Sequence, residues 1–331
     1  MVSIRTEGDT KSAFYSNWKS IGNSSGTGLL TSLVVIFAIL AFTTPYFFSV
    51  ENGLNILRAV SFIGIAAAAA TLVLVSGGID LSMAATMALA GTAAGGLIEA
   101  GYPLPVAVGA GLLAGVIVGV INAVIIVGFG INPLIATIGT QFAARGAAYV
   151  VVDNREVFIQ NPAFNWVGQA TVFSIPVSGI LMLLVFLFFA WLMRDTVFGR
   201  HIYAIGGTPN GTSALLSGVP VKKRMFQVYI ISGLSSAVAG LLLSSYSNSA
   251  TGYNAMGLEL PILAAVILGG TALGGGRGNV WGTLAGVLLV AVITNGLTLN
   301  NAALAWVLVV QGAILVLAVV IDERRQAKFE R

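Results

Sequence analysis

The chain has 331 residues, of which 57% are hydrophobic and only 8% are charged, whereas about 25% of the residues in an ordinary soluble domain are charged. This composition excludes a soluble enzyme and indicates a membrane protein. With no cysteine and a single histidine, the chain offers neither a disulfide framework nor a His/Cys cluster for a metal ion. We therefore expect no metal and no cofactor.

Long apolar runs follow a polar N-terminal segment, residues 1–28, that we predict to be cytoplasmic. A bilayer core about 30 Å thick requires about 20 apolar residues in a helix, and open strands would leave backbone groups without partners in lipid. The sequence therefore predicts an all-α polytopic membrane protein, with a transmembrane domain over residues 29–321 and a cytoplasmic tail over 322–331. The ten predicted spans are about residues 29–49, 57–76, 81–99, 105–129, 133–152, 175–194, 225–247, 258–274, 279–298 and 303–321.

The basic residues predict the orientation of these spans, because connections on the cytoplasmic side carry an excess of Lys and Arg. With both termini cytoplasmic, 13 of the 16 basic residues lie inside, and the other three are Arg58, Arg145 and Arg155. Residues 153–174 then form an outer loop, and residues 195–224 form a cytoplasmic loop. The net charge of +4 thus reflects topology, and we expect lipid rather than nucleic acid around the chain.

A polar break, residues 76–82, separates the second and third apolar runs. Gly77 or Gly78 can take the left-handed cap of the first helix, and Asp80 can accept hydrogen bonds from the N–H groups that open the next helix. Alternatively, Asp80 and Ser82 line a polar path for a solute, since a carboxylate at a helix break is expensive in a membrane and is often functional. Both interpretations are compatible with the sequence.

Four further polar residues within predicted spans are candidates for a solute pathway. Arg145 lies well inside its span, and Gln141 precedes it by one helical turn, so the two can form one polar stripe. Snorkelling of Arg145 to the outer interface is the alternative. Asn122 and Asn295 are expected to make hydrogen bonds between helices, or else to contact a solute with hydroxyl groups. Such a sparse polar set favours a neutral solute over an ion.

Glycine is abundant, with 41 residues, and it recurs at four-residue spacing at positions 91/95, 111/115/119 and 282/286. Such faces allow helix backbones to approach closely, either within this chain or at a subunit interface. Residues 72–91 and 264–286 also share an order of apolar run, paired glycines, polar break and apolar run. This similarity is compatible with an internal duplication and equally with chance.

Several ordered motifs resemble the membrane subunits of ribose-type, binding-protein-dependent ABC importers. They are VLVSGGIDLS (73–82), INPLIATIGT (131–140) followed by 144–146, GRHIYAIGG (199–207), LSGVPVKK (216–223) and LELPILAAVILGGTALGGGRGNVWGTLAG (258–286). The resemblance covers about residues 30–322. It implies a permease in the bacterial inner membrane, a second permease subunit, a cytoplasmic ATP-binding subunit and a periplasmic sugar-binding protein, with a monosaccharide or related polyol as solute.

No Gly-x-x-x-x-Gly-Lys-Ser/Thr sequence is present, so the chain has no standard phosphate-binding loop and is expected to be non-catalytic. A permease of this kind receives mechanical work through its cytoplasmic surface, and residues 195–224 form the one long cytoplasmic connection between spans. The candidate coupling residues are three glycines that permit sharp turns and three apolar residues that could occupy a groove: Gly206, Gly207, Gly218, Ala214, Leu215 and Leu216. A solvated loop without a partner is the alternative. The alternative function is a self-sufficient carrier or channel for a small polar solute.

Overall fold

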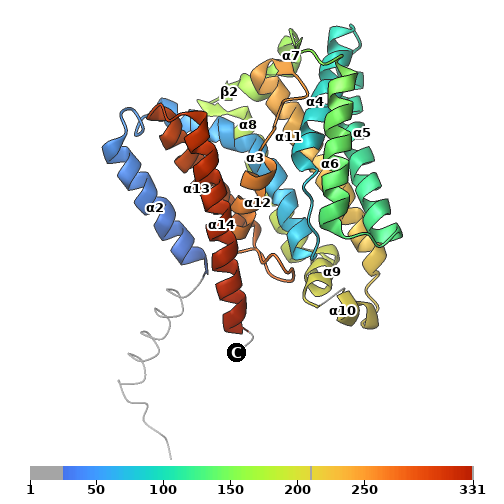
Figure 1. Cartoon of the computed structure of the whole chain (residues 1–331). Coiled ribbons are helices and arrows are strands. Elements are labelled where there is room, and N and C mark those ends of the chain that lie inside the picture. The colour runs from blue at the N-terminus through green and yellow to red at the C-terminus, as the bar shows by residue number, and fades with distance from the viewer. Residues whose placement is uncertain (1–24, 209–210, 330–331) are drawn as a thin grey trace, which may run out of the picture.

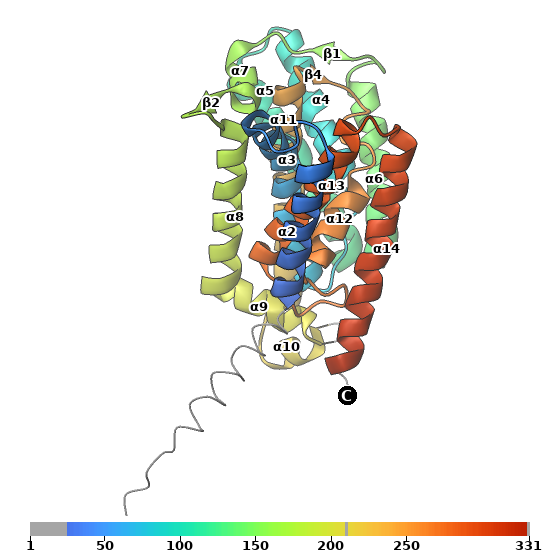
Figure 2. The same cartoon turned by 90° about the vertical axis from the view of Figure 1, so that its left-hand side faces the viewer.

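The computed structural model describes residues 25–208 and 211–329, so the predicted N-terminal segment 1–28 lies largely outside the described residues. Long helices run between two ends of the molecule, one carrying α7 (Pro162–Gln169) and the other carrying α10 (Thr212–Leu216). Both ends are visible in Figure 1 and, after a turn of 90°, in Figure 2. We refer to them as the α7 end and the α10 end.

The ten predicted apolar runs each contain a helix. These helices are α2 (Ser25–Thr43), α3 (Val50–Val75), α4 (Met83–Glu99), α5 (Leu104–Ala123), α6 (Pro133–Val151), α8 (Val177–Asp195), α11 (Val221–Ser247), α12 (Glu259–Leu268), α13 (Val280–Leu299) and α14 (Leu304–Phe329). A π-helical turn, η1 (Val124–Gly128), extends α5. Helix α14 continues past the predicted end of the last span at residue 321.

Local sequence explains where several helices begin. Asn132 accepts a hydrogen bond from the backbone N–H of Leu134 and precedes Pro133, the first residue of α6. Ser49 at the start of α3 and Asn279 at the start of α13 accept equivalent bonds. Side-chain oxygens at this position satisfy N–H groups that have no partner inside the helix, and proline at the first position sacrifices no hydrogen bond.

The two long connections are folded. Residues 153–174 contain α7 and the strands β1 (Val157–Phe158) and β2 (Thr171–Val172). Strand β1 pairs antiparallel with β4 (Ser249–Ala250), and β2 pairs with β3 (Ile175–Pro176). Residues 195–224 contain α9 (Val197–Gly206) and α10, at the opposite end of the molecule.

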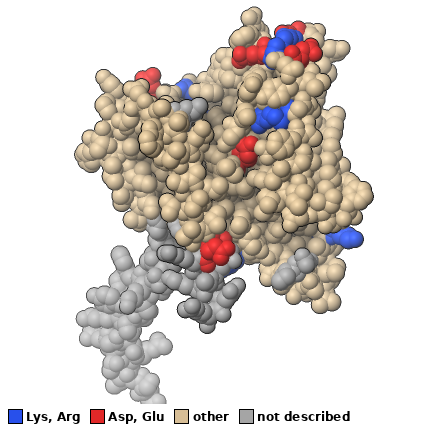
Figure 3. Space-filling view, viewed as in Figure 1, with Lys and Arg blue, Asp and Glu red and all other residues tan. Residues whose placement is uncertain are grey.

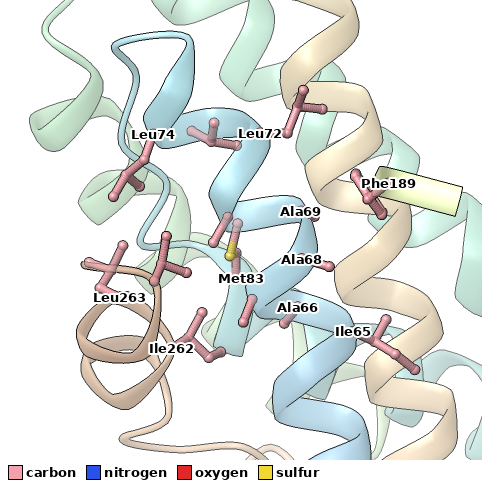
Figure 4. Packing of buried hydrophobic residues seen from close by; sticks show 14 of the residues in the cluster. Ile65, Ala66, Ala68, Ala69, Leu72, Leu74, Met83, Phe189, Ile262 and Leu263 are labelled. Carbon is pink, nitrogen blue, oxygen red and sulfur yellow. The ribbon is translucent and has the colours of Figure 1, made fainter. Parts of the chain in front are cut away.

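Helix α3 lies in the centre of the bundle. Its residues Ala66–Ala70 are fully buried, and small side chains there let neighbouring helices approach. Figure 4 shows Ile65, Leu72 and Leu74 of α3 among Phe189 of α8 and residues of α12. The core thus surrounds the C-terminal part of α3, from about residue 60 to Val75, which is apolar on nearly all sides as expected for a buried helix.

The regularly spaced glycines pack within this chain. A Cβ at Gly115 would overlap the carbonyl oxygen of Gly233 in α11, and one at Gly119 would overlap that of Tyr229. Gly286 meets Ala265 of α12 in the same way. The interpretation as close packing inside one subunit is confirmed at these positions.

Among the described residues, five helices have the length and apolarity needed to cross a membrane, namely α3, α5 with η1, α8, α11 and α13. The prediction of a full span at 258–274 differs from the structure, because α12 ends at Leu268 after 10 residues. At 1.5 Å per residue, such a helix covers about half of a bilayer core. Residues 251–258, which precede α12, are not helical. The fold is that of a helical, multi-pass membrane protein.

Candidate functional site

Three of the predicted pathway residues form one hydrogen-bonded cluster. Asp80 Oδ1 accepts from the backbone N–H of Ser82 at 2.9 Å and from its hydroxyl at 2.6 Å, and Asp80 Oδ2 accepts from the Ser232 hydroxyl of α11 at 2.6 Å. Asn122 of α5 donates to Ser82 Oγ at 2.8 Å and accepts from Thr140 of α6 at 2.6 Å. We call these five residues the Asp80 cluster. It links the 76–82 break to three helices.

The Asp80 cluster is closed to solvent and both carboxylate oxygens are used. Asp80 is 4% exposed, Ser82 is 1% exposed, and Asn122 is fully buried. Gly77 has a φ of +81°, which is the left-handed cap predicted from sequence. The predicted cap on the next helix is not formed by Asp80, because Ser82 is the N-cap residue of α4 and no side chain caps that helix. Asp80 instead accepts from the Ser82 N–H in the turn before α4.

The break at residues 76–82 adjoins the end of α9. Gly276 donates its backbone N–H to the carbonyl oxygen of Val75 at 2.9 Å, and a Cβ on Gly206 would overlap both of these atoms. A Cβ on Gly275 would lie 2.8 Å from the Cα of Gly77. We call this contact of three segments the glycine junction. At this junction the candidate coupling residue Gly206 contacts both of the similar segments, residues 72–91 and 264–286.

The first helix ends in the same way in both of the similar segments, residues 72–91 and 264–286. Gly77 and Gly270 have positive φ values of 81° and 91°. The N–H groups of Gly78 and Thr271 bond to carbonyl oxygens five residues earlier, at 3.0 and 3.2 Å. This pair of features is the Schellman cap, so the similarity of the two segments extends to backbone structure.

Gln141 and Arg145 form a second group on α6. Gln141 Nε2 donates to Glu259 Oε1 at 2.5 Å, and Arg145 Nη1 donates to the carbonyl oxygens of Gly252 and Asn254 at 2.7 and 2.6 Å. Both side chains of the predicted polar stripe therefore bond to residues 252–259. Arg145 thus bonds to the non-helical segment before α12, and its snorkelling to the outer interface stays an alternative prediction. We call Gln141, Arg145 and Glu259 the Arg145 cluster.

Asn295 lies apart from both clusters, so the structure does not unite all six predicted pathway residues. Its amide exchanges two hydrogen bonds with the amide of Asn52 in α3, at 2.9 and 3.0 Å. Asn52 also donates to the carbonyl oxygen of Phe47. Hydrogen bonding between helices accounts for Asn295.

The three apolar candidate coupling residues differ in solvent exposure. Ala214 is buried at 3% exposure, whereas Leu215 and Leu216 are 62% and 84% exposed. Gly206 and Gly207 end α9, and Gly218 has a φ of +79° in the turn after α10. Two adjacent leucines therefore project from the α10 end.

On the face shown in Figure 3, charged side chains are sparse across the middle of the molecule. Figure 3 shows blue and red atoms near both ends and one patch of each colour between them, near α6 and α12. At the α7 end, Arg155 donates two hydrogen bonds to Glu99, one of 2.7 Å and one of 2.5 Å. This bonding raises the pKa of the Arg155 guanidinium. No group of three potential metal ligands occurs among the described residues.

Sequence reasoning missed Glu259, Ser232, Thr140 and Asn52. Between Asn154 and Asp322 the sequence has three acidic residues, Glu156, Asp195 and Glu259. Glu259 alone of these lies at the start of a predicted span, and this position could have marked it as a candidate pathway residue. The two hydroxyl residues and Asn52 carry no such signal, because their partners lie 18 to 243 positions away.

Comparison with known proteins matches residues 52–319 to a family described as the branched-chain amino acid transport system permease component. The ribose import permease of Bacillus subtilis is 37% identical over 302 residues, which cover 91% of this chain and 93% of that protein. An L-arabinose ABC transporter permease of Azospirillum brasilense is 34% identical over 309 residues, covering 93% and 90%. The ribose import permease of Escherichia coli K12 is 35% identical over 301 residues, covering 90% and 93%. No solved structure matches significantly.

Proposed function

Because the chain belongs to this family of transport-system permease components, we propose that it is the membrane subunit of a bacterial ABC importer for a monosaccharide or related polyol. The observation that carries the proposal is the similarity to ribose and L-arabinose permeases along nine-tenths of the chain. The subunit is non-catalytic. Its partners are an ATP-binding subunit, a periplasmic sugar-binding protein and a second permease subunit in the inner membrane.

Reconstitution tests this function against the alternative of a self-sufficient carrier. The subunit is placed in liposomes alone, and then with its ATPase and binding protein, and uptake of labelled D-ribose and L-arabinose is measured. We expect uptake only when both partners and ATP are present. Uptake by the subunit alone would contradict the importer and support a carrier or channel.

We propose ten membrane-crossing segments with both termini in the cytoplasm. Three observations support this topology: the ten helices within the apolar runs, the 13-to-3 distribution of basic residues, and the described end of α14 at the α10 end (Figure 2). Helix α12 then crosses together with the non-helical residues before and after it.

Labelling of single cysteines tests this orientation, since the natural chain has none. Ser213 in α10 and Gln160 beside α7 are both exposed, and Gln160 is preferable to Asn161, whose side chain caps α7. An impermeant thiol reagent applied to spheroplasts is expected to label Gln160→Cys and not Ser213→Cys. The reverse pattern would invert the topology.

We propose that α9 and α10 dock the ATPase, with Leu215 and Leu216 in a groove of the partner. Supporting this role, the two leucines are exposed at the α10 end, and α9 leads directly to the glycine junction. A push on α10 would therefore be transmitted through backbone contacts to the ends of α3 and α12. The alternative of a solvated loop does not explain an exposed apolar pair on an ordered helix.

Replacing Leu215 and Leu216 by Asp would place charge in a desolvated contact, which is strongly unfavourable. Co-elution with the ATPase and stimulated ATP hydrolysis are expected to fall while membrane insertion is retained. The control carries Asp at Val172 and Phe173, an exposed apolar pair at the α7 end, and is expected to retain ATPase binding. Normal co-elution of the Leu215/Leu216 variant would show that α10 is only a connection.

A further inference from the structure

The Arg145 cluster contains one donor and one acceptor that the protein leaves unused. Arg145 Nη2 and Glu259 Oε2 are both buried, and neither has a hydrogen-bond partner among the described residues. One other atom of each group is engaged, because Arg145 Nη1 donates to two carbonyl oxygens and Glu259 Oε1 accepts from Gln141. Buried polar atoms without partners are few in native proteins, and each requires an explanation.

The two charged groups do not satisfy each other. Within the described part of the chain, ion pairs with a nitrogen–oxygen distance of up to 4.0 Å do not include Arg145 and Glu259. Each group is instead held in place by the bonds of its other atoms, so collapse into a direct pair would require at least one of those bonds to stretch or break. The unused atoms are thus held apart by the fold.

The position of the cluster suits contact with a solute. Glu259 is the first residue of α12, which follows a non-helical segment and is too short to cross a bilayer. Non-helical backbone at membrane depth occurs where it is buried in protein or lines a cavity, and helix breaks of this kind form binding sites in transporters. Arg145 and Glu259 are both half-buried, and their two unused atoms lie on the buried side of the cluster.

We propose that Arg145 Nη2 and Glu259 Oε2 form a subsite for a hydroxyl group of a neutral solute, an inference that rests on the proposed sugar import. A hydroxyl group both donates one hydrogen bond and accepts others, so it can donate to Glu259 Oε2 and accept from Arg145 Nη2. The opposite charges of the two side chains compensate each other, so neither a cation nor an anion gains over a neutral solute. Gln141 is a positioning residue, because it engages the other oxygen of Glu259.

Glu259→Gln is the most specific test of the subsite. The variant can keep its Oε1 as the acceptor for Gln141, while the unused oxygen becomes an NH2 group that cannot accept a hydrogen bond. No hydrogen bond present in the structure is removed, so the variant is expected to fold with an unchanged melting temperature. Glu99→Gln makes the same chemical change at an exposed glutamate and is the matched control.

The experiment measures uptake by the subunit assembled with its ATPase and binding protein in liposomes. D-ribose, L-arabinose and the monodeoxy analogues of each are the substrates. For wild type and Glu99→Gln, one deoxy analogue is expected to have a KM about tenfold above that of its parent sugar, because a hydrogen bond to a charged group is lost. For Glu259→Gln, the KM for the parent sugar rises about tenfold and the difference between the parent and that analogue disappears.

The outcomes separate the subsite from the function on which it rests. If wild type imports the sugars and Glu259→Gln does so with the same KM and the same discrimination, the subsite is refuted while the function is retained. A lower melting temperature with discrimination intact would assign Glu259 a structural role and also refute the subsite. If wild type imports no sugar, or imports leucine instead, both the proposed function and the hydroxyl subsite fail.

Discussion

The Asp80 cluster and the Arg145 cluster each place a carboxylate among helices, yet they differ in how completely its oxygens are used. Both oxygens of Asp80 accept hydrogen bonds, from three donors in total. Glu259 has one oxygen engaged and one buried oxygen without a partner, and Arg145 repeats this pattern with its two terminal nitrogens. A carboxylate with every oxygen satisfied stabilises a break in the chain, whereas one held with an atom unused is suited to a ligand.

Packing is much closer at the glycine junction than on the outer side of α6. Beside the Asp80 cluster, the glycine junction brings three backbone segments so close that a Cβ on Gly206 would overlap its neighbours. On α6, a Cβ on Gly139 would meet nothing within 4 Å, and Gly139 lies on the side of the helix away from Gln141, two residues later. The region around residues 75–82 is therefore closely packed, whereas the side of α6 that carries Gly139 is open.

The largest expected effect comes from Asp80→Ala, which removes the acceptor of three buried hydrogen bonds. Leaving buried donors unsatisfied costs about 1–3 kcal/mol for each group, and serine hydroxyls can recover part of this by rotating, so we expect the free energy of unfolding to fall by about 3 kcal/mol. The measurement is thermal unfolding of the purified subunit in detergent. Accumulation in the membrane is measured in parallel.

Asp80→Asn is the control for that loss. Its amide oxygen can still accept from Ser82, and its NH2 group can donate to Ser232, so stability and uptake are expected to change little. If Asp80→Asn folds normally but abolishes uptake, Asp80 is a pathway residue, and the comparison between the two clusters is wrong.

Next in size is Gly206→Ala at the glycine junction. Its Cβ would overlap the carbonyl oxygen of Val75 and the N–H of Gly276, and backbone atoms cannot move aside cheaply. Overpacking costs about 1–3 kcal/mol, and we expect both stability and ATP-driven uptake to fall. Gly139→Ala is expected to be neutral or stabilising, since alanine favours helices more than glycine does. Equal losses for the two variants would remove the contrast in packing.

Much of the fold was predictable because apolar runs of spanning length leave the chain little choice but helices. The ten runs each contain a helix. The predicted span 258–274 included residues 269–274, whereas α12 ends at Leu268 and is followed by Gly269 and by Gly270, which has a positive φ. Predicting where a helix ends inside an apolar region requires the cap geometry, which depends on positive φ at Gly270.

The candidate site was predictable in part, for a similar reason. The spacing of Gln141 and Arg145 places them on one face of α6 by local geometry alone. Their partner Glu259 lies 118 positions after Gln141, and no helical periodicity carries information across that separation. Asn295 bonds to Asn52 and not to the Asp80 cluster, because polarity within a span does not indicate which neighbour a side chain meets.

A smaller effect is expected at Asn52 and Asn295, whose side-chain amides exchange two hydrogen bonds outside both clusters. Asn295→Ala removes two hydrogen bonds but leaves Asn52 bonded to the carbonyl oxygen of Phe47. We expect a loss of about 1 kcal/mol in unfolding free energy, with KM unchanged. A double-mutant cycle with Asn52→Ala measures the coupling, and a raised KM would place Asn295 in the pathway.

The smallest expected effect is that of Glu99→Gln at the α7 end. Arg155 and Glu99 bond through two short contacts, but their side chains are 52% and 40% exposed, and exposed ion pairs contribute little because solvent and salt screen them. We expect no measurable change in the melting temperature, in KM, or in the dependence of either on ionic strength. Comparison of Glu99→Gln with Glu259→Gln therefore separates the effect of losing a negative charge from the effect of losing a buried acceptor. If Glu99→Gln raised KM as much as Glu259→Gln, any acidic residue would matter for transport, and the unused buried oxygen would not be the cause.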